Sequence, residues 1–214
     1  MDATLQKIIV TSHLLFSKYG IRSVSMNDIA NELGMSKKTL YTYVDNKADL
    51  VKLGLQAHLQ EECAVAQKIQ QEASNAIDET IQIGNYIYRQ LNMLNPAALY
   101  DLRKYYRDSW ELIEQHRTEF IYSIIAANLK NGIEQGLYRA NIKPELIARF
   151  YVAKASMFFI DTHNISKSVT NYKLGAIYLE LLKYHLYGIV SDKGMDYLKN
   201  KLNNIKNNTY VTDL

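Results

Sequence analysis

Hydroxyl and lysine side chains gather between positions 25 and 47, and their chemistry suits a polyanion. They are Ser25, Ser36, Thr39, Tyr43 and Lys47. Near the start of a helix such groups can donate hydrogen bonds to phosphate oxygens, because the first backbone N–H groups of the helix also point outward there. The pattern therefore predicts contacts with a phosphate backbone.

Two short helices must position these side chains. Ser25 followed by Asp28 is a capping-box variant that begins a helix over residues 26–33, and Gly34 ends it. After a three-residue turn, Ser36 can cap the next helix. This is the layout of a helix-turn-helix, whose second helix enters the DNA major groove while the first braces it.

The second of these helices begins at Lys37 and turns Leu40 and Val44 inward. Its outward positions hold the side chains able to reach base edges, which are Lys37, Lys38 and Thr42. As a spacing pattern alone, such a helical turn fits a packing motif as well as a DNA reader.

The rest of the chain has a helical pattern, and two prolines and nine glycines leave few breakers. We predict a first helix over 4–19, a long helix from 47 to about 70, and later helices over about 77–91 and 96–104. Further segments are predicted over 109–135 as one helix, over 144–160 and 172–190, and as a weak helix from 192. The expected fold class is all-α.

Composition excludes several other classes of protein. A single cysteine, Cys63, rules out an internal disulfide, and no apolar run is long enough to span a membrane or serve as a secretion signal. We therefore expect a cytoplasmic protein. Because no phosphate-binding glycine loop, nucleophile elbow, HExxH motif or metal-ligand spacing of histidines is present, we expect no enzyme activity, no cofactor and no metal.

The segment from residue 16 to residue 50 resembles the DNA-binding domain of the TetR/AcrR family. The resemblance rests on Phe16 and Gly20, followed by Ser25-Met26-Asn27-Asp28-Ile29-Ala30, Leu33-Gly34-Met35-Ser36-Lys37-Lys38-Thr39-Leu40-Tyr41, Tyr43-Val44, Asn46-Lys47 and Leu50. Two positions depart from the family pattern, since Lys38 replaces a frequent glycine and Val44 a frequent phenylalanine. The first departure adds charge to the expected DNA face, and the second alters the core.

The resemblance implies a three-helix DNA-binding domain over 1–46, a connecting helix over 47–70 and a helical ligand-binding and dimerisation domain over 71–214. It implies that positions matching Ser25, Thr39, Tyr41, Tyr43 and Lys47 contact the phosphate backbone. Those matching Lys37, Lys38 and Thr42 are implied to read bases. The partners it implies are double-stranded operator DNA and a second copy of the chain, with the protein at the nucleoid when DNA-bound.

In this family the two helices before the tail usually form the dimer interface, and here they correspond to 144–160 and 172–190. Both are rich in apolar side chains, which fits either a four-helix interface or an ordinary buried core. The candidate interface residues are Tyr151, Ala155, Phe158, Phe159, Tyr178, Leu182, Leu186 and Ile189.

A central ligand cavity is the remaining expectation, because effector pockets are mostly apolar with a few polar groups. Candidate lining residues, each of which also fits plain core, are Tyr86, Trp110, Phe120, Tyr122, Met157 and His163. The function expected from the resemblance is a repressor released from its operator by a small apolar or amphipathic effector. A DNA-binding regulator without an effector and a helical protein-interaction module stay open as alternatives.

Overall fold

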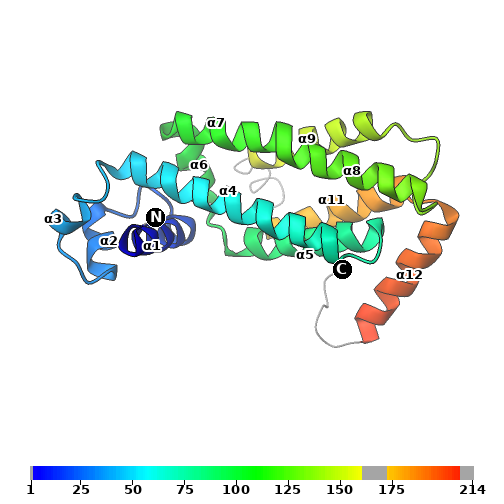
Figure 1. Ribbon diagram of the computed structural model, residues 1–214, viewed down its shortest axis with the longest axis horizontal. Coiled ribbons are helices and arrows are strands. Elements are labelled where there is room, and N and C mark those ends of the chain that lie inside the picture. Colours follow the sequence, from blue (N-terminus) through cyan, green and yellow to red (C-terminus); the bar gives the residue numbers. More distant parts are fainter. Residues whose placement is uncertain (1, 161–172, 208–214) are drawn as a thin grey trace. The chain divides into compact units, whose positions relative to one another are not determined.

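Helices make up the regular structure in the part of the chain that the computed structural model describes, residues 2–160 and 173–207. Figure 1 shows α1 (Ala3–Tyr19), α2 (Met26–Glu32), α3 (Lys37–Leu40), α4 (Lys47–Glu72), α5 (Ala76–Met93), α6 (Pro96–Tyr105), α7 (Arg107–His116), α8 (Tyr122–Glu134), α9 (Pro144–Ile160), α11 (Leu174–Ile189) and α12 (Asp192–Asn207). Tyr138 and Val190 form an isolated antiparallel bridge. The predicted all-α fold is confirmed.

The chain packs as two compact units. The first unit comprises Met1–Val65 and Met93–Arg117, and the second comprises Ala66–Asn92 and Thr118–Leu214. Helix α4 therefore supplies its first turns to one unit and its last turns to the other. This grouping describes packing, and the functional division after residues 46 and 70 stays a prediction.

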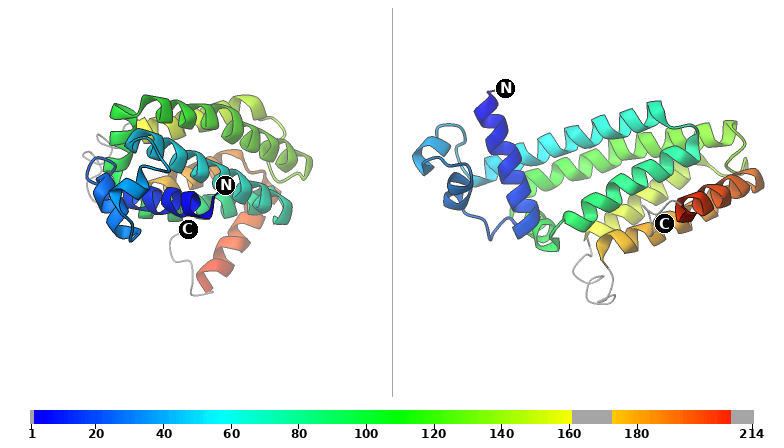
Figure 2. Two further views of the ribbon diagram at one scale, coloured as in Figure 1. Left: turned by 60° about the vertical axis from the view of Figure 1, so that its left-hand side comes forward. Right: turned by 90° about the horizontal axis from the view of Figure 1, so that it is seen from below.

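An apolar core holds the first unit together. Leu40 and Val44 lie in it beside residues of α1, α2 and α4, and Ala98 and Leu102 of α6 belong to the same cluster. The right-hand view of Figure 2 shows α1 crossing the first part of α4. A Cβ atom at Gly54 of α4 would lie 3.2 Å from His13 Cβ, so this glycine permits the close approach of the two helices.

Hydrogen bonds fix α6 to the end of α1. The Asn95 backbone N–H donates to the Ser17 carbonyl at 2.8 Å, and the Asn95 side-chain amide donates to the Lys18 carbonyl at 3.2 Å. The Asn95 side-chain oxygen also accepts from the Ala97 N–H at 2.9 Å and so caps α6. One side chain thus begins α6 and attaches it to the N-terminal helices.

A buried polar network lies inside the second unit. The Tyr138 hydroxyl lies 3.0 Å from both the Ala76 carbonyl oxygen of α5 and Asn128 Oδ1 of α8. Thr80 Oγ1 lies 3.0 Å from the same Asn128 oxygen. Gly132 makes room for the Tyr138 ring, because a Cβ there would lie 2.0 Å from ring carbon Cδ2. The network holds α5 and α8 in one register.

The C-terminal helix α12 is anchored to the start of α5. The Tyr197 hydroxyl donates to Asp78 Oδ2 at 2.9 Å, and Lys201 Nζ lies 3.0 Å from Asp78 Oδ1. Leu198 between them is buried. The weak helix predicted from residue 192 is therefore a packed element over Asp192–Asn207.

The expectation of one continuous α-helix over 109–135 is wrong in its middle. A π-helical segment, Arg117–Ile121, separates α7 from α8. A π-turn is a single turn with i→i+5 hydrogen bonds inside a helical segment, and the α-helical pattern continues on both sides of it. Apolar periodicity alone therefore could not reveal it.

Candidate nucleic-acid interface

The turn between α2 and α3 has the backbone that a helix-turn-helix requires. Gly34 has a φ of +65°, a conformation that side chains disfavour, although nothing lies within 4 Å of a Cβ built there. The Met35 N–H donates to the Ala30 carbonyl at 2.9 Å across the turn. Glycine is needed at position 34 for its backbone freedom, whereas space is not limiting.

The capping box predicted at Ser25 is present and occupies its donors. The Ser25 backbone N–H and hydroxyl both donate to Asp28 Oδ2 at 2.7 Å, and the Asp28 N–H donates to Ser25 Oγ at 3.2 Å. The hydrogen bonds from Ser25 hold the pKa of the Asp28 carboxyl below its usual value. In this arrangement Ser25 stabilises the start of α2, and its hydroxyl proton is already used.

Ser36 caps α3 and leaves one hydroxyl proton available. The Thr39 N–H donates to Ser36 Oγ at 3.0 Å, and the Ser36 and Thr39 hydroxyl oxygens lie 2.8 Å apart. Only one of the two hydroxyls donates in that pair. The other proton is free to reach a phosphate oxygen, and both side chains are exposed.

Regular α-helix ends at Leu40, and the next residues continue as a turn. The Thr42 and Tyr43 N–H groups donate to the carbonyls three residues back, each at 3.1 Å. The Thr42 hydroxyl donates to the Thr39 carbonyl at 2.6 Å, so its oxygen and methyl group are left for contact with a base. The recognition element is thus a short helix extended by one tighter turn.

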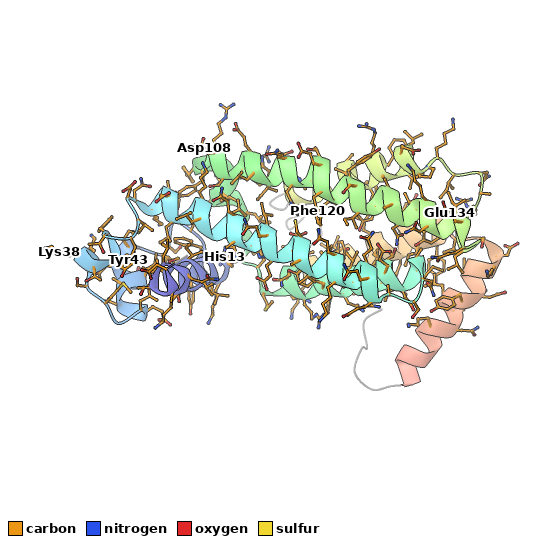
Figure 3. All side chains as sticks on the ribbon, in the orientation of Figure 1. His13, Lys38, Tyr43, Asp108, Phe120 and Glu134 are labelled. Atoms are coloured by element: carbon orange, nitrogen blue, oxygen red, sulfur yellow. The ribbon has the colours of Figure 1, made fainter. Side chains whose placement is uncertain are left out.

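The face of this element that points away from the core carries the predicted base-reading residues. Lys37, Lys38 and Thr42 are exposed, whereas Leu40 is fully buried. Figure 3 shows Lys38 at the outer side of α3 and Tyr43 on the segment that follows. Tyr41 is also exposed, with Lys37 Nζ 5.9 Å from its ring centroid.

Lys47 is held at the start of α4 by its surroundings. Its ammonium group lies 5.7 Å from the Phe16 ring centroid, and the side chain is partly buried. Burial lowers the pKa of Lys47, while the carboxylates of Asp101 and Asp28 oppose that shift. Lys47 therefore has a more defined position than an ordinary surface lysine.

The structure brings the nine predicted DNA-facing residues onto one unit. Ser36, Lys37, Lys38, Thr39, Tyr41 and Thr42 share the exposed side of α3 and its turn, with Tyr43 partly buried beside them. Ser25 and Lys47 stand at the starts of α2 and α4.

Sequence reasoning missed Asp101 of α6, which is buried. Its carboxylate accepts a hydrogen bond from the Arg22 backbone N–H at 2.8 Å, and its charge partly offsets the lowering of the Lys47 pKa by burial. No local motif marks it, because its partners are about 55 to 80 positions away.

The candidate ligand residues divide between the two units. Trp110 belongs to the first unit and packs partly buried against its core, with the Arg117 guanidinium 5.5 Å from its ring. Tyr86, Phe120 and Tyr122 belong to the second unit and are partly buried. The Met157 side chain and His163 lie outside the described residues.

Four of the candidate interface residues form the interior of the second unit. Tyr178, Leu182, Leu186 and Ile189 are buried, and a Cβ at Gly84 of α5 would lie 2.2 Å from Leu182 Cδ2. Tyr151 is partly buried, and its hydroxyl oxygen lies 3.3 Å from that of Tyr178. The side chains of Ala155, Phe158 and Phe159 lie outside the described residues.

Other apolar residues of α9 and α11 are exposed. Phe150 is 54% exposed and Tyr184 is 74% exposed. Leu146 and Tyr187 are exposed as well. The sequence pattern is consistent with these exposed apolar side chains, since both helices are apolar on more than one side. These four residues, termed the α9–α11 outer face, were not among the predicted ones.

The described residues contain neither a group that could bind a metal ion nor a helix that could span a membrane. No cluster of three or more histidine, cysteine, aspartate or glutamate side chains there could hold a metal ion. No helix among the same residues is both long and apolar enough to cross a bilayer.

Comparison with known proteins places the helix-turn-helix in a family. Residues 8–53 match the family described as bacterial regulatory proteins, tetR family. The uncharacterized HTH-type transcriptional regulator YvaF of Bacillus subtilis is 26% identical over 192 residues, which is 89% of this chain and 98% of that protein. An HTH-type transcriptional regulator of Staphylococcus aureus strain USA300 is 41% identical over 54 residues, or 25% of this chain and 29% of that protein.

Solved structures share the fold over most of the chain. A transcriptional regulator from Cytophaga hutchinsonii has a TM-score of 0.70 at 19% identity, covering 89% of this chain and all of that one. A candidate transcriptional regulator from Saccharomonospora viridis, solved in complex with choline, has a TM-score of 0.69 at 16% identity, with 89% of this chain and 100% of that chain covered. The N-terminal domain of this chain is thus that of the TetR family of DNA-binding transcriptional regulators, and a regulator with the same kind of domain is similar to the chain over most of its length.

Proposed function

We propose that the chain is a repressor that binds a pseudo-palindromic operator as a homodimer and is released by a small effector. DNA binding is supported most directly by the exposed side of α3 and its turn. Lysine and hydroxyl side chains are exposed there, and the buried Leu40 fixes the element to the core. Two such elements in a dimer would enter successive major grooves about one helical turn apart. For a protein acting on operator DNA, we propose a cytoplasmic location in a bacterium.

Within this surface the side chains have different proposed roles. Lys37, Lys38 and Thr42 read base edges, since they point outward from the recognition element. Backbone phosphates are bound by a second set, which fixes the register on the duplex and comprises Ser36, Thr39, Tyr41, Tyr43 and Lys47. Ser25 contributes by capping α2, because its donors are engaged with Asp28.

The α9–α11 outer face supports the dimer. Phe150 and Tyr184 expose large apolar surface that a second copy of the chain would remove from water. The candidates Tyr178, Leu182, Leu186 and Ile189 are buried within the second unit, while Tyr151, Ala155, Phe158 and Phe159 stay proposed contacts on α9.

Light scattering tests this dimer. Wild type is expected to be a dimer at micromolar concentration without DNA. Tyr184→Asp is expected to favour the monomer because it replaces an exposed ring at the proposed contact with a charge that would lose hydration there. Tyr100→Asp, at an exposed tyrosine of the other unit, is the matched control and should leave the dimer intact. A monomeric wild type would contradict the dimer, and a dimeric Tyr184→Asp would contradict this choice of interface.

An effector site is proposed for the helical part beyond the helix-turn-helix. The choline complex of the Saccharomonospora viridis protein supports it by fold likeness, since that fold accommodates a small molecule. The proposed lining residues in the second unit are Tyr86, Phe120, Tyr122, Met157 and His163, and Trp110 stays a separate candidate in the first unit. Because α4 belongs to both units, a displacement of its last turns is a route by which an effector could shift Lys47 at its start. To act as a switch, the effector must favour the non-binding state by a few kcal/mol.

Binding to DNA from its own upstream region, with and without small molecules, tests the function. We expect salt-sensitive binding that an apolar or amphipathic compound abolishes. That compound should also raise protein stability by about 2.7 kcal/mol at 100 times its dissociation constant. DNA binding with no responsive compound in a broad thermal-shift screen would favour a regulator without an effector. If the protein does not bind DNA, the remaining alternative is a helical protein-interaction module.

A further inference from the structure

An exposed cluster of two cations and two tyrosines lies on the first unit, outside the helix-turn-helix. It consists of Arg22 together with Tyr100, Lys104 and Tyr105 of α6, and is termed the α6 basic cluster. Arg22 Nη1 donates to the Tyr105 hydroxyl at 3.1 Å, and the guanidinium carbon lies 4.8 Å from the Tyr105 ring centroid. Lys104 Nζ donates to the Tyr100 hydroxyl at 2.7 Å and lies 5.3 Å from the Tyr105 centroid. Both cations thus lie against the Tyr105 ring.

The two cations lack an acidic counterpart among the described residues. No ion pair there involves the side chain of Arg22 or Lys104. The carboxylate of Asp101, on the same helix, is buried and accepts the backbone N–H of Arg22. Two cations against one tyrosine ring repel each other, and a polyanion that binds both would relieve that repulsion. Both tyrosines are 46% exposed, so the cluster is open to a large anion.

The cluster adjoins the proposed DNA surface. Arg22 stands three residues before Ser25, a separation that the chain spans in at most about 11 Å. Lys47 at the start of α4 is close enough to both Arg22 and Asp101 for their charges to affect its pKa. Arg22 of the cluster and Lys47 therefore lie near each other on the first unit.

We propose that the α6 basic cluster binds the phosphate backbone of duplex DNA next to the segment read by α3. The proposal rests on the DNA-binding function and extends its contact surface to α6. Arg22 and Lys104 supply charge-assisted donors, and the tyrosines hold them in place. A duplex is favoured over an isolated anion because the cluster adjoins Lys47, so that consecutive phosphates of one strand can reach both.

Salt-dependent binding measures the number of bound phosphates directly. Each phosphate that the protein neutralises contributes about 0.9 to the magnitude of the slope of log affinity against log salt. Arg22→Ala and Lys104→Ala are each expected to reduce the slope by about 0.9 per bound copy, and the double variant by about twice that. At 0.1 M salt each substitution should weaken binding roughly eightfold for each bound copy of the chain. Arg22→Ala keeps the backbone N–H that Asp101 accepts, so the loop before α2 should retain its fold.

Two probes and two controls sharpen the experiment. Fluorescence anisotropy is measured on a random-sequence duplex of about 40 base pairs, long enough for a dimer spanning two half-sites, and on the protein's own upstream fragment. A phosphate contact should affect both probes equally. Lys104→Arg keeps the charge and should retain the wild-type slope. Lys130→Ala removes an exposed lysine of α8 that pairs with Glu145, and it should leave binding unchanged. Hydroxyl-radical footprints of the double variant should lose protection at their outer edges while the centre stays protected.

The outcomes separate this inference from the function on which it rests. A double variant with the wild-type slope and footprint, while wild type binds DNA, would overturn the cluster's role and indicate a different anionic partner. A wild type that binds neither probe would overturn DNA binding itself, and the cluster's role with it.

Discussion

The two units differ in the side chains that they expose at their proposed partner surfaces. The first unit keeps Leu40 in an apolar core and exposes the lysines of its recognition element. The second unit buries Asp78 and Asn128 in polar contacts, while Phe150 and Tyr184 are exposed. Exposed lysines bind a polyanion such as DNA through its phosphates. Exposed apolar area becomes favourable when a protein partner removes it from water. The contrast favours DNA as the partner of the first unit and protein as that of the second.

The largest expected effect comes from the core beneath the recognition element. Leu40→Ala should lower the free energy of unfolding by about 2–5 kcal/mol, because it leaves a cavity at a fully buried site. It should also weaken DNA binding, since Leu40 anchors the exposed face of α3. Urea unfolding and anisotropy on the same samples measure both effects.

Leu198→Ala is the matched change in the second unit, where Leu198 is similarly buried on α12. A similar loss of stability is expected, but with DNA affinity unchanged at temperatures where the variant is folded. Equal losses of DNA affinity in both variants would contradict the proposal that the first unit alone contacts DNA.

Acid should destabilise both units through one partly buried histidine in each. Burial lowers the pKa of His13 to about 4, with the neighbouring His58 adding to the shift, and burial with Lys154 nearby lowers the pKa of His185 to about 4. The unfolded chain protonates these rings near pH 6.5, so between about pH 6.5 and 4 it binds more protons than the folded chain. Stability should therefore fall as the pH drops through that window, by up to about 3 kcal/mol per histidine.

Denaturant unfolding between about pH 7 and pH 4 measures this loss. His13→Gln and His185→Gln should each flatten the pH dependence, because an amide does not titrate there. A pH profile that neither variant changes would show that the two rings are protonated in the folded protein as readily as in the unfolded one.

The smallest expected effect on stability is at the cap of α3. Ser36→Ala should cost about 1 kcal/mol, because the Thr39 N–H loses its acceptor. It should also weaken DNA binding, because the recognition element loses the cap of α3 and one of its two paired hydroxyl groups. Ser123→Ala serves as the control, since this exposed serine of α8 donates to the Phe120 carbonyl. DNA affinity that drops equally in both variants would argue against a specific role for Ser36.

The first unit was predictable from sequence to the extent that its signals are local. The Ser25–Asp28 capping box, the left-handed Gly34 and the Ser36 cap all act within three or four residues, and the structure has each of them at the predicted position. The packing of α6 beside the helix-turn-helix was not predictable. It depends on Asn95 and Asp101 contacting residues about 80 positions away.

In the second unit the helices were predictable, whereas their buried faces were not. Residues 172–190 are apolar on more than one side, so periodicity could not decide that Leu182 faces Gly84 while Tyr184 faces solvent. Tertiary packing makes that choice. The polar network around Tyr138 is equally invisible in the pattern, since its members come from separate segments of the chain.

Binding to DNA across a salt series tests the central claim most directly. Wild type, Lys37→Ala and Lys47→Ala are compared on the protein's own upstream fragment and on a scrambled fragment of the same length. Lys37→Ala should cost roughly 1–3 kcal/mol on the native fragment alone, because its shortened side chain no longer reaches a base edge. Lys47→Ala should weaken both fragments alike and reduce the slope by about 0.9 for each phosphate that it no longer binds. A wild type without salt-sensitive binding, or two variants that bind as wild type does, would contradict the account.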